Sequence, residues 1–167
     1  MLITKKYGNI YSSPVLHKSI DVLPVEWYET GKRILHRTTA GGVNVTLKFL
    51  SENPNLQDGD ILWEEGDAMI VVQMIPTQCI IIAPVSINAA GALCYEIGNR
   101  HLPLFHDENE LLIPYDAPLH NLLQASEYMI RIEERKLKYP FKTTVLPHVQ
   151  VAGNDSIPAK VLPLSIT

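Results

Sequence analysis

The residues best suited to chemistry in this sequence are its six histidines, which are His17, His36, His101, His106, His120 and His148. A neutral imidazole can move protons or bind a metal ion near neutral pH. The first two have no acidic or cysteine neighbour at metal-ligand spacing, and His120 falls outside the leucine face of its predicted helix. We interpret these three as ordinary polar residues. His106, beside Asp107, is either a turn residue or an auxiliary ligand in the neighbourhood of His101.

Familiar catalytic and phosphate-binding motifs are missing from the chain. It has no Gly-x-Gly-x-x-Gly, no Gly-Lys-Ser/Thr phosphate loop and no Gly-x-Ser-x-Gly. Cys79 and Cys94 lack the spacing of a zinc site and do not suggest a disulfide framework. A metal-dependent hydrolase would need clustered ligands and a general base, and no such cluster is visible. We therefore expect a protein that is not an enzyme.

His101 stands out because of its place after a predicted helix that stops at Gly98-Asn99. The end of a helix dipole stabilises a cation there, so spacing alone favours an ordinary helix-end residue. One imidazole does not define a strong metal site, which usually takes three or four ligands. It could contribute to one if a twofold axis brought the same residue of a second subunit alongside it.

Composition narrows the class of protein further. The chain has 167 residues, 46% of them hydrophobic, which suits one ordinary domain or two small ones. A net charge of −4 with mixed signs excludes nucleic acid as the expected partner. The densest charged run, residues 133–136, is interpreted as a solvated strand end or face. No apolar run approaches the roughly 20 residues of a membrane span, and no signal peptide is evident, so we expect a cytoplasmic protein.

Residues 1–75 carry the pattern of a small all-β domain. Apolar and polar side chains alternate along residues 43–49, which is the period of a half-buried strand. Turn residues predict two hairpins, the first pairing residues 33–39 with 43–49 and the second pairing residues 60–64 with 68–75.

The remaining pattern predicts an α+β fold with a ferredoxin-like domain over residues 76–146. A strand at 79–82 leads to Ser86, a helix N-cap, and apolar residues then recur at helical spacing. Strands are expected at 102–105, 110–115 and 128–132, and Asp116 caps a second helix. The apolar face of that helix is expected to hold Leu119, Leu122, Leu123 and Ser126. This order is β-α-β-β-α-β. Residues 147–167 have no sustained period and are expected to form a mobile or loosely attached tail.

One segment resembles a known family. Residues 95–101 read Tyr-Glu-Ile-Gly-Asn-Arg-His, which is similar to the Y-x-x-G-N-R-H signature of UreE-type urease accessory proteins. The Trp-Tyr-Glu-Thr-Gly-Lys-Arg segment at 27–33 and the Gly-Asp-Ile-Leu segment at 59–62 agree with it. The resemblance extends over residues 1–148.

The resemblance implies a homodimeric nickel metallochaperone that donates Ni(II) for assembly of the urease active site. Residues 1–75 would form its peptide-binding-like domain, and residues 76–146 its metal-binding and dimerisation domain. His101, one from each subunit, would be the essential metal ligand, and His148 a supplementary ligand from the tail. The implied partners are a UreG-type GTPase and the urease apoprotein complex. Zinc and copper are further ions that the site could accept in vitro.

Two departures from the family and two alternatives qualify this expectation. No histidine follows His148, so the histidine-rich tail of some members, and its storage of nickel, is not expected here. Tyr115 and Ala117 stand where some members have histidines, so that auxiliary metal site is not expected. The alternatives are a metal-dependent hydrolase and a peptide-binding adaptor in which His101 is only structural.

Overall fold

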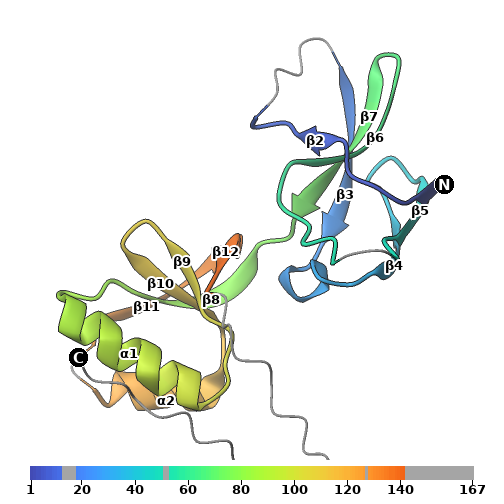
Figure 1. Ribbon diagram of the computed structural model, residues 1–167. Helices are drawn as coiled ribbons and strands as arrows, with labels where there is room; N and C mark the ends of the chain where they lie inside the picture. The colour runs from blue at the N-terminus through green and yellow to red at the C-terminus, as the bar shows by residue number, and fades with distance from the viewer. Residues whose placement is uncertain (13–17, 51–52, 127, 142–167) are drawn as a thin grey trace, which may run out of the picture.

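The computed structural model describes residues 1–12, 18–50, 53–126 and 128–141, and has the expected α+β fold. The strands of the N-terminal part come first, and both α-helices lie in the C-terminal part (Figure 1). The predicted tail, with His148, lies outside the described residues, as does His17. That residues 1–75 and 76–146 are separate domains with those bounds stays a prediction.

The N-terminal part contains two small sheets around one core. One sheet has the order β1-β5-β4 and the other β2-β6-β7-β3. Their strands are β1 (Leu2–Ile3), β2 (Gly8–Asn9), β3 (Ser19–Val25), β4 (Ile34–Thr38), β5 (Asn44–Lys48), β6 (Asp60–Glu65) and β7 (Ala68–Met74). Both predicted hairpins, β4-β5 and β6-β7, are confirmed, and Gly42 and Gly66 supply positive φ in their turns. Leu23, Leu47 and Leu62 are completely buried between the sheets.

Strand β3, which pairs in parallel with β7 over seven residues, is not among the predicted strands. Its sequence, Ser-Ile-Asp-Val-Leu-Pro-Val, places a proline within the strand. Proline cannot donate to a ladder and is tolerated at a sheet edge, which is where β3 lies. A parallel partner that is distant in sequence leaves no hairpin signal between the two strands.

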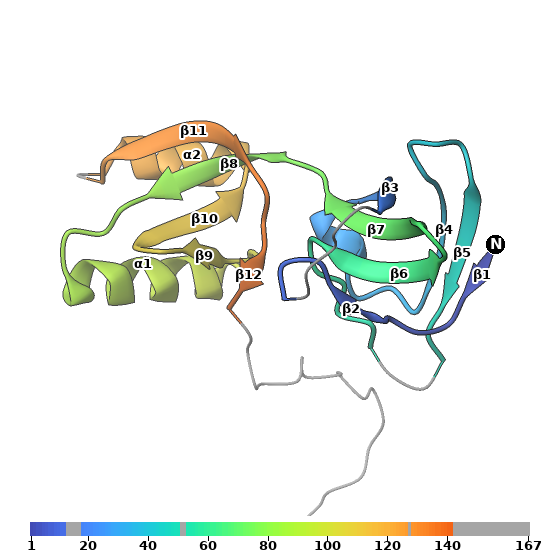
Figure 2. The same ribbon diagram turned by 90° about the horizontal axis from the view of Figure 1, so that it is seen from above.

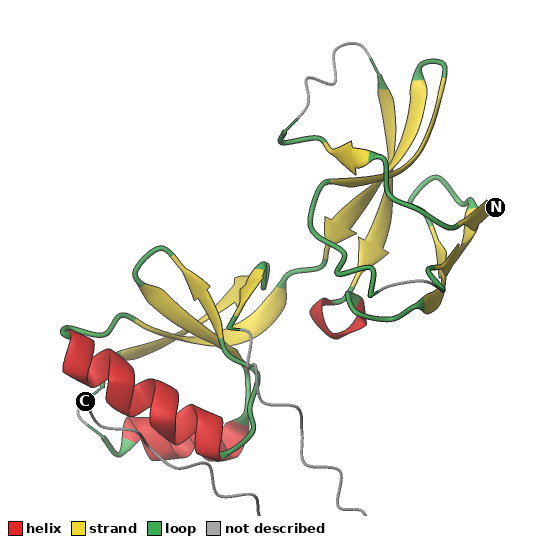
Figure 3. Ribbon diagram, in the orientation of Figure 1, coloured by secondary structure: helices red, strands yellow, loops and turns green. Residues whose placement is uncertain are grey.

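The C-terminal part has the ferredoxin-like order that the sequence predicts. Its elements are β8 (Thr77–Ile82), α1 (Ile87–Asn99), β9 (Phe105–Asp107), β10 (Glu110–Pro114), α2 (Ala117–Gln124), β11 (Ile130–Arg135) and β12 (Tyr139–Pro140). The sheet order is β11-β8-β10-β9-β12, in which the short β12 extends the motif. Figure 3 shows both helices against one face of this sheet, where Leu93, Ile97, Leu119 and Leu123 meet Ile80 and Ile113.

Both predicted helix N-caps are confirmed. The Ser86 side chain accepts a hydrogen bond from the Ala89 amide at 3.1 Å, and that of Asp116 accepts one from the Leu119 amide at 2.8 Å. Each cap satisfies an amide that has no partner within the helix. No helix among the described residues is long and apolar enough to cross a membrane.

Several predicted details of this part are wrong. The strand expected at 102–105 is instead β9, which starts at Phe105, because Leu102 belongs to the helix terminus described below. Leu122 is 41% exposed rather than on the buried face of α2, and Ser126 lies beyond the end of that helix. The strand expected at 128–132 begins at Ile130 and continues to Arg135.

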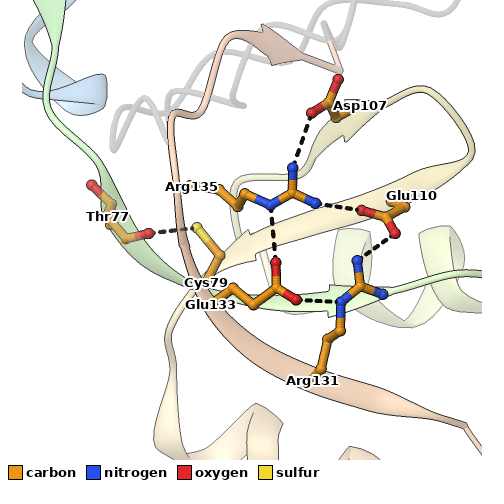
Figure 4. A network of polar contacts seen from close by, with 7 residues as sticks. All are labelled: Thr77, Cys79, Asp107, Glu110, Arg131, Glu133 and Arg135. Carbon is orange, nitrogen blue, oxygen red and sulfur yellow. Dashed lines mark hydrogen bonds and ion pairs between the residues drawn. The ribbon is translucent and has the colours of Figure 1, made fainter.

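A network of ion pairs covers part of the helix-free face of the C-terminal sheet (Figure 4). Arg135 on β11 donates to Glu133 at 3.1 Å and to Glu110 on β10 at 2.9 Å, and Arg131 also pairs with both carboxylates. Asp107 on β9 lies 3.6 Å from Arg135. The apolar stems of such arginines can cover sheet surface while their charges stay in water.

Contacts also join the two parts of the chain, on the side where β12 lies (Figure 2). The rings of Trp27 and Phe105 meet edge to face with centroids 5.7 Å apart. The buried carboxylate of Asp58 accepts hydrogen bonds from Lys136 at 3.0 and 3.2 Å, and Lys138 lies 3.4 Å away. The expectation that residues 133–136 are only a solvated face is therefore wrong for Lys136.

Because the carboxylates of Asp58 and Glu29 are buried, we expect the protein to lose stability in acid. Burial would raise the pKa of Asp58 and Glu29, but hydrogen bonds outweigh it and hold both pKa values below the ordinary range. The donors to Asp58 include the Met74 amide and Lys136, and those to Glu29 include Arg37. A pKa lowered by folding stabilises the native state above the unfolded value, near pH 4, and this contribution is lost as pH falls through the folded value.

We expect the free energy of unfolding, measured by urea denaturation, to fall as pH decreases from about 5 to about 3. The double variant Asp58→Asn, Glu29→Gln should show a shallower decline in that range. A decline equally steep in the variant would mean that other carboxyls cause it.

Candidate metal site

His101 lies just past the end of helix α1, and the predicted stop at Gly98-Asn99 is confirmed, since Asn99 is the last helical residue. The helix includes Asn99, Arg100 is the C-cap, and His101 takes the left-handed conformation with φ +55°. The amide of His101 donates to the Gly98 carbonyl at 3.0 Å, and that of Leu102 donates to the Ile97 carbonyl at 3.4 Å. These two bonds form a Schellman motif with His101 in its left-handed position.

Glycine usually fills that position, because a Cβ in the left-handed region costs roughly 1–2 kcal/mol. An observed residue of this kind justifies asking what the side chain does. Leu102 packs against the cluster that contains Ile97, so the turn is anchored on both sides of His101. The imidazole is therefore presented at the exposed end of a fixed helix.

The face of α1 that leads to His101 is exposed and carries apolar and small residues. Ile87 is 86% exposed and Tyr95 is 73% exposed. A Cβ added at Gly91 or Gly98 would meet no atom of the chain within 4 Å. At 3.6 residues per turn these four positions span about 80° of the helix circumference. Nothing in the described part of the chain covers this face.

The described residues contain no group of three or more histidine, cysteine or carboxylate side chains able to hold a metal ion. A site at His101 therefore needs ligands from outside these residues. Each of the other described histidines has a different neighbour. His36 lies 3.0 Å from the Thr46 hydroxyl, and the ring centroid of His120 lies 5.6 Å from that of Tyr115.

His106, the auxiliary-ligand candidate, lies on β9 among aromatic side chains. Its ring stacks on Tyr139 at 5.7 Å and meets Phe141 edge to face at 5.1 Å. It also lines a cavity of about 420 Å³ between the two parts of the chain, together with Trp27 and Lys138. This arrangement gives His106 aromatic contacts rather than metal-binding neighbours.

The two cysteines are free thiols in different surroundings. Cys79 is completely buried, its sulfur donates to the Thr77 carbonyl at 3.0 Å, and burial raises the pKa of this thiol. Cys94 is half-buried against the core between the helices and the sheet. A raised pKa disfavours the thiolate, which is the form that binds metals, so Cys79 is a structural residue.

Sequence reasoning missed Asp58 as a residue that joins the two parts of the chain. It precedes β6 next to Gly59 and is only 7% exposed. The Asp-Gly dipeptide is a signal for a turn and does not indicate a buried carboxylate. The lysines that the carboxylate meets are 78 and 80 positions further on, and no local pattern could reveal them.

These features define a two-domain α+β protein, with an all-β part followed by a ferredoxin-like part and an exposed histidine at a helix end. Residues 3–74 match the description "UreE urease accessory protein, N-terminal domain", and residues 78–155 match the corresponding C-terminal domain. The chain belongs to the UreE family of urease accessory proteins. It is an accessory protein and not an enzyme.

Individual relatives agree with this assignment. The urease accessory protein UreE of Flavobacterium johnsoniae is 34% identical over 148 residues, which cover 89% of this chain and 90% of the relative. That of Acetivibrio thermocellus is 38% identical over 71% of this chain and 77% of its own length. That of Geobacillus kaustophilus is 35% identical over 85% of this chain and 95% of its own length. The family resemblance found in residues 95–101 is thereby confirmed.

Proposed function

We propose that this protein is a homodimeric nickel metallochaperone that binds Ni(II) between its subunits and donates it during assembly of the urease active site. The observation that carries the proposal is His101, a histidine held in a left-handed position where glycine is usual. The helix face beside it is exposed and lacks side chains at Gly91 and Gly98. Membership of the urease accessory family supplies the functional context.

The exposed face of α1 supports the homodimer. Glycine within a helix costs roughly 0.5–1 kcal/mol relative to alanine, and the chain itself gives no steric reason for Gly91 or Gly98. Close approach of helix α1 of a second subunit would explain why both positions are glycine. A twofold axis along this face would place the same residues of two subunits opposite one another, including both His101 side chains.

The ligand chemistry suits a carrier. Imidazole nitrogens bind nickel well, and they also accept zinc and bind copper more tightly, so selectivity would come from metal supply and partners. Two histidines from two subunits, with His148 as a supplementary ligand, leave coordination positions to water. A metal ion that is coordinated partly by water is released more readily than one that is coordinated by four protein ligands. Nickel is therefore cargo here, passed on in the cytoplasm to a UreG-type GTPase and the urease apoprotein complex.

The dimer surface can be tested at Gly98. We expect Gly98→Gln to weaken dimerisation about tenfold or more, because overpacking of a closely packed contact costs about 1–3 kcal/mol. The helix itself should gain stability, since glutamine is the better helix former. Sedimentation velocity at several concentrations would measure the dimer, and far-ultraviolet circular dichroism the helix.

The matched control is Leu122→Gln, a change to the same residue at an exposed apolar position of the other helix. It should leave dimerisation unchanged. A Gly98→Gln protein that dimerises like the wild type would place the dimer contact elsewhere.

The proposed function as a whole is tested by nickel transfer. The full chain, loaded with nickel, is mixed with the urease apoprotein complex in the presence of a chelator that removes free nickel. We expect urease activation by the loaded wild-type chain and none by nickel with chelator alone. Equal activation with and without the chain would contradict a carrier role.

A further inference from the structure

Arg100 and Glu96 form an ion pair directly beside His101. The guanidinium of Arg100 donates through Nε and Nη2 to the same carboxylate oxygen of Glu96, at 3.0 and 2.9 Å. The two residues are four apart on α1, so Glu96 holds the guanidinium over the preceding turn of the helix. The ion pair therefore ties the Arg100 guanidinium to a residue four positions before it in the helix rather than leaving it free to move beside His101.

Glu96 and Arg100 are the charged side chains of the last two turns of α1. Residues 93–101 read Leu-Cys-Tyr-Glu-Ile-Gly-Asn-Arg-His, so no other acidic, lysine or arginine side chain belongs to the last two turns of the helix. A carboxylate is disfavoured near a helix C-terminus, where the dipole is negative. The position of Glu96 is therefore unfavourable for its interaction with the helix dipole, but it allows the carboxylate to neutralise Arg100.

We propose that Glu96 sets the metal affinity of the His101 site by neutralising Arg100 and holding it back. This inference rests on the proposed function, because it concerns the nickel that His101 binds. Arg100 directly precedes His101 in the chain, so a divalent ion bound at His101 would lie within about 10 Å of Arg100. The positive charge of Arg100 would repel that ion. In a dimer each subunit contributes one Arg100 and one Glu96, so the effect of either residue counts twice.

The charges act through water, so the expected effects are moderate and depend on salt. With the Debye length near 30 Å at 0.01 M ionic strength, removing one charge from each subunit should change the nickel dissociation constant about tenfold. Near 0.15 M the change should be about threefold, and at 1 M it should be below about twofold.

The test compares Glu96→Gln with Arg100→Gln by competitive nickel titration of the full-length dimer. Glu96→Gln leaves an unpaired cation and should weaken binding, whereas Arg100→Gln leaves an unpaired anion and should strengthen it. The double variant should bind nickel within about twofold of the wild type, because both charges are gone. Glu65→Gln, an exposed carboxylate in the N-terminal part, is the control for net charge.

The design separates electrostatics from structure. Both single variants lose the same ion pair, so a purely structural role would shift nickel affinity in the same direction in both. Shifts of opposite sign that shrink with salt support the proposal, and shifts of equal sign, or none, overturn it. His101→Asn distinguishes failure of the proposed metal site from failure of the proposed role of Glu96. If His101→Asn binds nickel like the wild type, the proposed site fails as well. If nickel binding depends on His101 but the two single variants do not shift the affinity in opposite directions, only the role of Glu96 is overturned.

Discussion

Replacing His101 by asparagine is expected to lower nickel affinity by more than about 100-fold while leaving the fold and the dimer intact. Loss of residues that merely orient metal ligands already costs 10–100-fold, and this change would remove the ligand itself from both subunits. Asparagine is chosen because it tolerates the left-handed conformation that His101 adopts at φ +55°. Alanine would add backbone strain and confuse loss of a ligand with loss of the helix end.

Two further variants complete this experiment. His101→Gly should also lose nickel, while its free energy of unfolding should equal or exceed that of the wild type, since glycine adopts this backbone without a Cβ penalty. His36→Asn, at an exposed histidine of the N-terminal sheet, should bind nickel normally. Isothermal titration measures binding and light scattering measures the dimer. Wild-type affinity in His101→Asn would exclude His101 as the metal ligand.

Features of the fold that depend on neighbours in sequence were predictable. Ser86 and Asp116 were identified as helix caps because a cap acts on an amide only three residues away. The hairpins around Gly42 and Gly66 were predicted because turn residues and strand alternation lie side by side in the sequence. The ferredoxin-like order was predictable because apolar residues change along the sequence between the alternation of a strand and the spacing of a helix.

Features that depend on distant or unusual contacts were not predictable. Strand β3 and its parallel partner β7 are separated in the sequence by β4, β5 and β6. Strand β12 consists of two residues, too few to show a period. Helix α1 ends at Asn99 as predicted, but glycine is the usual left-handed residue at a helix end, so the sequence does not show that His101 takes this conformation instead of Gly98. The family signature makes His101 the candidate metal ligand, but neither the conformation of His101 nor the pairing of Arg100 with Glu96 can be inferred from that signature.

Asp58→Asn is expected to destabilise the protein by about 2–3 kcal/mol and to loosen the contact between its two parts. Asp58 is 7% exposed, and its carboxylate accepts hydrogen bonds from the Met74 amide, the Tyr11 hydroxyl and Lys136. Breaking a buried ion pair costs about 3–5 kcal/mol, and the value is lower here because the two lysine side chains are about one-third exposed. Asparagine can still accept from the amide, so the loss should fall mainly on the lysine contacts.

Urea denaturation of Asp58→Asn measures the stability, and limited proteolysis measures access to the segment around Lys136 and Lys138. Asp67→Asn is the matched control, because it removes the same charge at the exposed turn between β6 and β7. Lys136→Met offers an independent test, since it removes the ammonium but leaves the carboxylate with Lys138 and should cost less than Asp58→Asn. If Asp58→Asn unfolds at the same urea concentration as Asp67→Asn, and is cleaved no faster, the buried carboxylate does not hold the two parts together.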